Sequence, residues 1–199
     1  MSDQSDSLFP EHGGYARLRS FQAAQLVYDA TLIFCDRFIE KRSRTHDQMV
    51  QAARSGAQNI AEGSMASGTS KKTELKLTNV ARASLEELLL DYQDYLRQRG
   101  LRQWAKDSPE ALAVRGKYRE NQSDQSDGSD GSDRYKLRTA SAEAAANTLI
   151  CLVNQASYLL GRQLRNLEQQ FLEKGGFTER LHAARVKTRS DQSDRFRPV

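Results

Sequence analysis

Four long stretches of the chain place apolar residues three and four positions apart, which is the period of one face of an α-helix. They cover about 15–42, 47–62, 71–99 and 138–173. The whole chain has only three prolines, and good helix formers dominate between its polar repeats. The first two links are short, so consecutive helices must lie side by side. We therefore expect an all-α protein, built as an antiparallel up-and-down four-helix bundle.

The first stretch carries more apolar residues than one core face requires. Two neighbouring stripes run along it, the first through Phe21, Tyr28, Leu32, Cys35 and Ile39, and the second through Val27, Phe34 and Phe38. So wide an apolar face indicates either deep burial or a subunit interface. We favour the interface.

The second and third stretches are expected to pack closely. Small residues dominate the inward stripe of the second, which consists of Met49, Ala53, Ala57 and Ile60 with Gly56 beside it. We expect Asp47 to cap the start of this helix and Gly63 to end it in a left-handed conformation. Ser70 should cap the third helix and Gly100 should end it. Gly175 and Gly176 should end the fourth.

A short acidic motif, Ser-Asp-Gln-Ser-Asp, occurs at 2–6, 123–127 and 190–194. Such segments cannot bury a core, and they lie where a chain accepts extra residues, so we expect disorder at 1–14 and 120–134. The second copy belongs to an insertion at 101–137 that also holds Trp104 and a short helix starting at Pro109, with Ser108 as its cap. Residues 174–199 are expected to form a short basic helix and a disordered tail. The repeats are either neutral insertions or acidic mimics of nucleic acid that weaken its binding.

The charge distribution fits either a polyanionic partner or a well-solvated helical surface. Residues 17–119 and 134–189 together hold 28 Lys and Arg against 16 Asp and Glu, a net charge of +12, whereas the whole chain has only +4. Nucleic acid is the commonest cytosolic polyanion, and contacts from such a surface are mainly to phosphate. The candidate nucleic-acid-binding residues are Arg37, Lys41, Arg42, Arg44, Lys71, Lys72, Lys76, Arg97, Arg99 and Arg102. Tyr92, Tyr95 and Trp104 are candidates for base stacking, although the helical spacing of the two tyrosines favours a core position.

The stretch Ser55 to Leu96 contains three elements in a fixed order. They are Asn59-Ile60-Ala61-Glu62-Gly63, Ser70-Lys71-Lys72, and Ala81-Arg82-Ala83-Ser84-Leu85-Glu86-Glu87-Leu88. In this the chain resembles the bacterial four-helix-bundle family named after proteins encoded in intervening sequences of 23S ribosomal RNA genes. Relatives of that family include the accessory variability determinants of diversity-generating retroelements.

The resemblance implies a small bundle that assembles into a ring, typically a homopentamer, with no established enzymatic activity. It also implies binding of nucleic acid and of a reverse transcriptase through basic surfaces, as in the accessory-protein relatives. Asn59, Glu62, Gly63, Ser84 and Glu87 are the matching motif residues, for which we expect structural roles. The insertion at 101–137 and the extension after the fourth helix depart from the family pattern.

Enzymatic chemistry finds little support in the sequence. Glu62 and Glu87, near each other if the second and third helices are antiparallel, are a pair that could act as acid and base or hold a metal, but capping or pairing with arginine is the simpler role. No Glu-x-x-His, Cys-x-x-Cys or nucleophile-elbow pattern occurs. A helical ribonuclease would pair an Arg with His46, but Arg42 and Arg44 lie too close to it in sequence. We expect no catalytic residue, metal or cofactor.

The remaining features indicate a cytoplasmic protein. No apolar run is long enough for a membrane span, and the N-terminus lacks the features of a signal peptide. Cys35 and Cys151 are expected to be reduced, buried thiols. The leading hypothesis is thus a non-enzymatic basic bundle that forms a ring-like oligomer and binds RNA or a ribonucleoprotein partner. The alternative is a structural or protein-binding oligomer without a nucleic-acid role.

Overall fold

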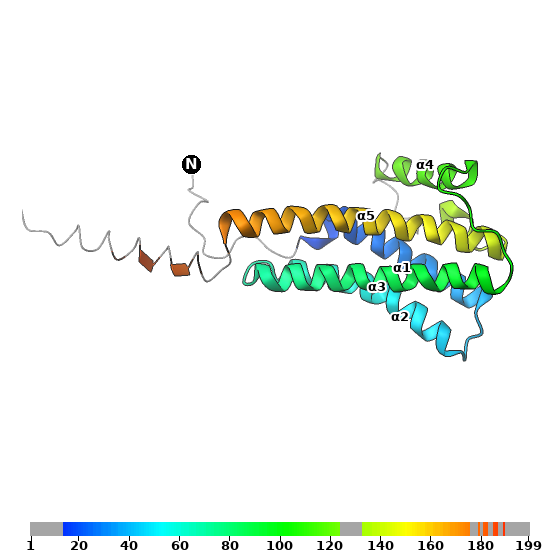
Figure 1. The fold of residues 1–199 in the computed structure, drawn as a ribbon, viewed down its shortest axis with the longest axis horizontal. Coiled ribbons are helices and arrows are strands. Elements are labelled where there is room, and N and C mark those ends of the chain that lie inside the picture. Colours follow the sequence, from blue (N-terminus) through cyan, green and yellow to red (C-terminus); the bar gives the residue numbers. More distant parts are fainter. Residues whose placement is uncertain are drawn as a thin grey trace, which may run out of the picture.

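A computed structural model describes residues 14–123 and 133–175, together with positions 179, 181, 182, 185, 186 and 189. The described chain is all-helical, as expected (Figure 1). Its elements are a short 3-10 turn η1 (Tyr15–Arg17), α1 (Arg19–Phe38), α2 (Arg44–Ala66), α3 (Lys71–Gln98), α4 (Pro109–Ser123), a second 3-10 turn η2 (Asp133–Tyr135) and α5 (Ala142–Lys174). None of the described helices is both long and apolar enough to cross a membrane.

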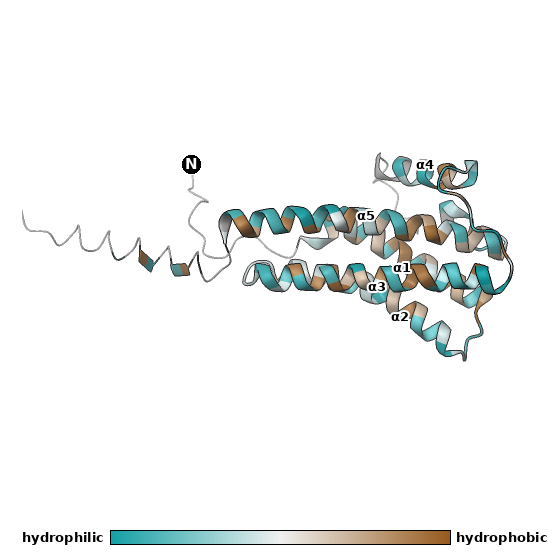
Figure 2. Ribbon diagram, in the orientation of Figure 1, coloured by the Kyte–Doolittle hydropathy of each residue, from teal (hydrophilic) through white to brown (hydrophobic). Residues whose placement is uncertain are grey.

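The four long helices contact one another in a cycle. Helix α1 packs against α2, α2 against α3, α3 against α5, and α5 against α1. The end of α1 lies beside the end of α3, where the rings of Phe34 and Tyr95 are 4.9 Å apart. The start of α1 lies beside the later part of α5, where the Ser20 hydroxyl donates to the Gln163 amide oxygen. Hydrophobic segments gather where these helices run together (Figure 2).

Helix α1 is shorter than the expected 15–42. Leu18 is extended, with ψ of 122°, and separates η1 from the helix, while Ile39 is extended at its end. The extended backbone of Leu18 interrupts the helical conformation there, and no side chain caps the first turn of α1. The extended Ile39 redirects the chain toward α2.

Two predicted ends of α2 are wrong. Ser43, not Asp47, is the cap, because its hydroxyl accepts a 3.2 Å hydrogen bond from the His46 backbone N–H. Asp47 lies inside the first turn, where its charge interacts favourably with the helix dipole. Gly63 lies within the helix and is buried. A Cβ there would come within 3.3 Å of the Glu74 carbonyl oxygen, so Gly63 permits close helix packing and does not form a left-handed cap.

The other predicted caps are confirmed. The Ser70 hydroxyl accepts from Thr73 N–H at 3.1 Å, and the Ser108 hydroxyl accepts from Ala111 N–H at 3.2 Å. Gly100 and Gly175 both have positive φ, which ends α3 and α5 without the strain a side chain would bring. Helix α5 begins at Ala142, capped by Ser141, and not at 138.

The core uses Val27 and Phe34 of the second apolar stripe of α1, together with Cys35 of the first. Val27 and Phe34 are buried, whereas Leu32 from the first stripe is 37% exposed and Tyr28 is half-buried. Cys35 is buried as expected, while Cys151 is only half-buried, and both are free thiols. The predicted stripe of α2 is confirmed, with Met49, Ala53, Gly56, Ala57 and Ile60 all buried.

Part of the inserted region is helical where disorder was expected. Residues 120–123 continue α4, and 133–135 form η2, so the predicted disorder at 120–134 is wrong at both ends. Helix α4 packs through Ala111, Val114 and Tyr118, all of which are buried, and it contacts α5. Residues 1–13 and 124–132, Gly176, and most of 177–199 lie outside the described residues, and with them most of the predicted basic helix.

Candidate nucleic-acid interface

Three basic segments meet at one end of the helices. The end of α1 lies beside the segment before α5, where the Arg37 guanidinium donates to the Leu137 carbonyl oxygen. The end of α3 is fixed to the start of α5, where Trp104 N–H donates to the Asn147 side-chain oxygen at 2.7 Å. We call this the basic end and define it by the cations of 37–44, 97–106 and 134–138. The sequence analysis did not include the last segment among the candidates. Its pattern is visible in the sequence, where Arg134, Lys136 and Arg138 alternate with Tyr135 and Leu137.

Several candidate cations at the basic end already have partners. Lys41 pairs with Asp36 at 3.4 Å, and Arg97 pairs with Asp94 at 2.9 Å. Arg102 lies 2.6 Å from the Glu110 carboxylate and 3.9 Å from that of Glu143. These side chains are exposed and their pairs are individually weak. Binding a phosphate through them nevertheless requires exchanging one anion for another.

The remaining candidates at this end are open to solvent. Arg42 and Arg44 are exposed, and within the described part of the chain neither has a carboxylate partner. Arg99 is also exposed, and its guanidinium lies 3.8 Å from the centre of the Tyr95 ring. Stacking of this kind orients the guanidinium while leaving its N–H groups available to an anion. These three arginines are the best placed to contact phosphate.

The lysine cluster at 71–76 lies at the opposite end. Its position follows from Gly63 of α2, which packs against Glu74 and Thr78 at the start of α3. Lys71 is 2.7 Å from the Glu74 carboxylate, and both side chains are largely buried, so Lys71 neutralises a buried charge and is unsuited to binding phosphate. Lys72 and Lys76 are exposed. As expected, the ten candidate cations do not form one compact patch.

Of the three aromatic candidates for base stacking, only Trp104 is outside the buried core. Tyr92 is fully buried and Tyr95 is 6% exposed, in accord with their predicted core position. Trp104 is half-buried between the exposed residues Arg102 and Lys106. Its backbone N–H donates to the Asn147 side-chain oxygen, which fixes the backbone of this residue at the basic end.

The motif residues divide between two roles. The Ser84 hydroxyl is 2.9 Å from that of Ser55, which also accepts from the Asn59 amide at 3.0 Å, so these side chains join α2 to α3. Gly63 permits the close approach of the same two helices. The expected structural roles of Asn59, Gly63 and Ser84 fit this geometry.

Glu62 and Glu87 do not approach each other. Gly63 packs against Thr78, and Glu87 lies nine residues further along α3. At 1.5 Å per residue this separates the two carboxylates by about 13 Å along the helix axis. Both are exposed, and the prediction that they could share a site is wrong. Glu87 instead lines an open groove of about 400 Å³ between α2 and α3, together with Arg44, Gln51 and Ser84.

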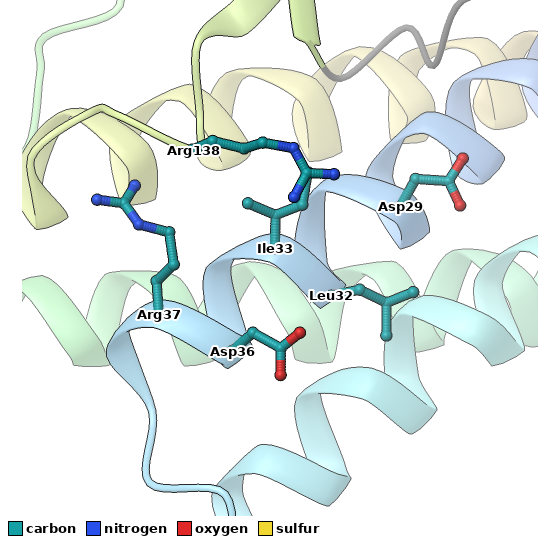
Figure 3. Close-up of a pocket in the computed structure, with 6 residues that line it drawn as sticks. All are labelled: Asp29, Leu32, Ile33, Asp36, Arg37 and Arg138. Atoms are coloured by element: carbon teal, nitrogen blue, oxygen red, sulfur yellow. The ribbon is translucent and has the colours of Figure 1, made fainter.

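A second open groove, of about 490 Å³, lies along the outer side of α1 (Figure 3). It is lined by Asp29, Leu32, Ile33, Asp36, Arg37 and Arg138. Figure 3 shows Arg138 reaching over Ile33 while Arg37 extends in a different direction. Two aspartates offset the two arginines, so this groove is not selective for anions.

The geometry gives no support to hydrolytic chemistry. Both ring nitrogens of His46 are buried and have no hydrogen-bond partner, and Nδ1 lies 3.7 Å from the Asp47 carboxylate. In this conformation neither nitrogen can reach an external substrate. Over the described residues, no three His, Cys, Asp or Glu side chains are grouped so as to hold a metal ion.

Comparison with known proteins adds no identification. No family model, no curated protein and no solved structure matches this chain.

Proposed function

We propose that this protein binds nucleic acid, RNA in particular, through electrostatic contacts at its basic end. The observation that carries the proposal is that Arg42, Arg44 and Arg99 of the basic end are exposed and without a carboxylate partner among the described residues. Trp104 offers an aromatic surface beside them for stacking with an unpaired base. Contacts of this kind are made mainly to phosphate and carry little sequence information.

We further propose that the protein acts as an assembly. Three open arginines on one copy give only weak binding, and several copies in a ring would engage many phosphates at once. The four long helices then form an up-and-down four-helix bundle, and the ring is a homopentamer by resemblance to the intervening-sequence family. The same resemblance suggests a non-enzymatic protein whose partner is a ribonucleoprotein, for instance a reverse transcriptase. We also propose that the protein is cytoplasmic.

A structural or protein-binding oligomer without a nucleic-acid role is the second candidate. It is favoured by large apolar side chains left on the surface, among them Leu90 at 61% and Tyr158 at 58% exposure. The two candidates share self-assembly and differ in whether the basic end has a polyanionic ligand.

A titration of a structured RNA hairpin at several salt concentrations tests the proposal. The intact protein should bind with an affinity that falls steeply with salt. The triple variant Arg42→Ala, Arg44→Ala, Arg99→Ala should bind more weakly at every salt concentration, and the slope of log K against log salt should become shallower by about two to three.

The matched control is the triple variant Lys72→Ala, Lys76→Ala, Arg162→Ala, which removes the same charge from the other end of the helices. It should retain most of the affinity. Equal losses for the two triple variants would show that only net charge matters. Absence of salt-sensitive RNA binding by the intact protein would contradict the proposal and favour the oligomer without a nucleic-acid role.

A further inference from the structure

Helix α3 presents an acidic surface centred on an exposed leucine. Leu90 is 61% exposed, and Glu86, Glu87 and Asp94 lie four and three residues before it and four after it, on the same face. The stretch 83–94 holds four carboxylates and no Lys or Arg. Arg82 lies 3.8 Å from Glu86 and Arg97 lies 2.9 Å from Asp94 at its two ends, which leaves Glu87 and Asp91 as the carboxylates without an ion pair in the described chain. This face is opposite the one that buries Leu85, Leu88 and Tyr92. We call it the acidic face of α3.

Helix α4 presents the opposite pattern. It buries Ala111, Val114 and Tyr118, while Leu112 is 53% exposed. Arg115 and Arg119 follow Leu112 at three and seven residues and so lie on its side of the helix. The stretch 111–119 holds three cations and no carboxylate. We call this the basic face of α4.

The two faces belong to different parts of the molecule. Helix α4 packs on the outer side of α5, and its main contacts with the other helices are there (Figure 1). Leu90, Glu86, Glu87 and Asp94 of the acidic face are exposed, as are Leu112 and Arg119 of the basic face. Glu87 lies at the edge of its face, beside the groove between α2 and α3, and Arg115 is half-buried.

We propose that the basic face of α4 of one copy packs on the acidic face of α3 of the next copy. Leu112 would meet Leu90, with Arg115 and Arg119 beside Glu86, Glu87 and Asp94. This inference rests on the self-assembly part of the proposed function and names the surfaces that produce it. Because the two faces differ, the contact is head-to-tail, and repeated contacts close into a ring when the rotation between copies permits it.

The charge arrangement on α3 supports an arriving cation. Glu87 and Asp91 are one helical turn apart, and within the described chain no ion pair neutralises either of them. Burial raises the pKa of the Asp91 carboxyl, and the nearby carboxylates of Glu87 and Asp94 raise it further. Cations from a second copy would relieve this repulsion.

The basic face is also held in place on its own molecule. The Arg115 guanidinium donates to the Lys106 carbonyl oxygen, and Ser108 caps the first turn of α4. A 15-residue helix is about 22 Å long, so one contact covers only a few turns and is individually weak. Ring closure supplies the added stability, because each copy then makes two contacts.

Charge reversal tests the pairing with the full-length protein. One variant carries Glu86→Lys and Glu87→Lys, and the other carries Arg115→Glu and Arg119→Glu. Mass measured by sedimentation or light scattering should show a self-association at least about tenfold weaker for each variant alone. A single chain that carries all four substitutions should recover the assembly. An equimolar mixture of the two variants should associate more strongly than either alone, although two partners cannot alternate throughout a ring of five. The reversal Lys72→Glu, Lys76→Glu is the control and should leave the mass unchanged.

A second pair of variants, Leu90→Gln and Leu112→Gln, separates loss of the interface from loss of the fold. Both side chains are exposed, so each monomer should tolerate the change. Each should weaken assembly with unaltered helix content. Unchanged mass in the reversal variants, or failure of the chain with all four substitutions to recover assembly, would overturn the inference. RNA binding is measured separately on the same proteins, so the proposed nucleic-acid role can fail while the interface holds, and the reverse.

Discussion

The Tyr92 hydroxyl donates a 2.9 Å hydrogen bond to the Thr31 hydroxyl, and both residues are completely buried. Thr31 in turn donates to the Val27 carbonyl oxygen at 2.7 Å. These two hydrogen bonds tie the later part of α3 to α1, the helix whose buried face the sequence left undecided. Burial raises the pKa of Tyr92 well above its usual value, so the phenol remains a neutral donor.

Replacing either partner should therefore have unequal effects. Thr31→Val leaves the buried Tyr92 hydroxyl without an acceptor and should lower the free energy of unfolding by about 1 to 3 kcal/mol. Tyr92→Phe leaves Thr31 still donating to Val27 and should lower it by only about 1 kcal/mol. The double variant should lose less than the sum, as measured by urea denaturation. Strict additivity would contradict the hydrogen bond.

Asn147 should control the position of the only tryptophan. Its side chain is 2% exposed, accepts from Trp104 N–H, and donates to the carbonyl oxygens of Arg102 at 2.8 Å and Glu143 at 2.9 Å. Asn147→Leu breaks all three bonds and leaves buried backbone groups unpaired, a loss of about 2 to 4 kcal/mol. Trp104 emission should shift to the red and become easier to quench with iodide. Asn154→Leu is the control, since exposed Asn154 donates only to the Ile150 carbonyl and its loss should leave the emission unchanged.

Replacing glycine by alanine should change the free energy of unfolding in opposite directions at two helical positions. A Cβ at Gly56 would lie 2.7 Å from a terminal methyl of Leu85, which is fully buried, so Gly56→Ala should destabilise the protein by about 1 to 2 kcal/mol despite the better helix propensity of alanine. At Gly161 the nearest atom is 3.8 Å away and belongs to the long Arg165 side chain. Gly161→Ala should stabilise by about 0.5 to 1 kcal/mol. Thermal unfolding of the two variants measures both effects. Stabilisation by Gly56→Ala would show that α2 and α3 are packed less tightly than described.

Stability should fall at alkaline pH. Burial, with the charges of Asp36 and Asp91, raises the pKa of the Cys35 thiol from 9.0 to about 12, and burial together with the nearby Tyr118 raises that of Tyr135 from 10.0 to about 12. The unfolded chain therefore loses these protons first. Stability is complete below pH 9 and decreases from there toward pH 12, by at most about 1.4 kcal/mol per pH unit for each group.

Cys35→Ala should make this decrease shallower just above pH 9, before tyrosines begin to ionise in the unfolded chain. Urea denaturation across the alkaline range measures the slope for both proteins. An identical slope in the variant would show that the Cys35 thiol does not contribute.

The sequence by itself predicted the four long helices, both ends of α3 and the end of α5, because these depend on residues close together in the chain. Ser70 and Ser108 cap, Gly100 and Gly175 terminate, and the small-residue stripe of α2 is buried. The ends of α2 were missed where two local choices compete. Ser43 and Asp47 are both good caps, and a glycine within a helix looks like a terminator until a neighbouring backbone is seen to lie against it.

Only the tertiary structure decided which surfaces face the core and which cations remain open. Of two apolar stripes on α1, the one with Val27 and Phe34 faces the core, whereas Leu32 of the other is 37% exposed and only its member Cys35 is fully buried, because the neighbouring helices cover only part of the helix surface. Arg97 and Arg102 look like Arg99 in the sequence, yet two of the three meet carboxylates and the third stacks on Tyr95. Those contacts depend on rotamers and on neighbours from other segments. Periodicity and net charge, which are local or summed quantities, do not contain that information.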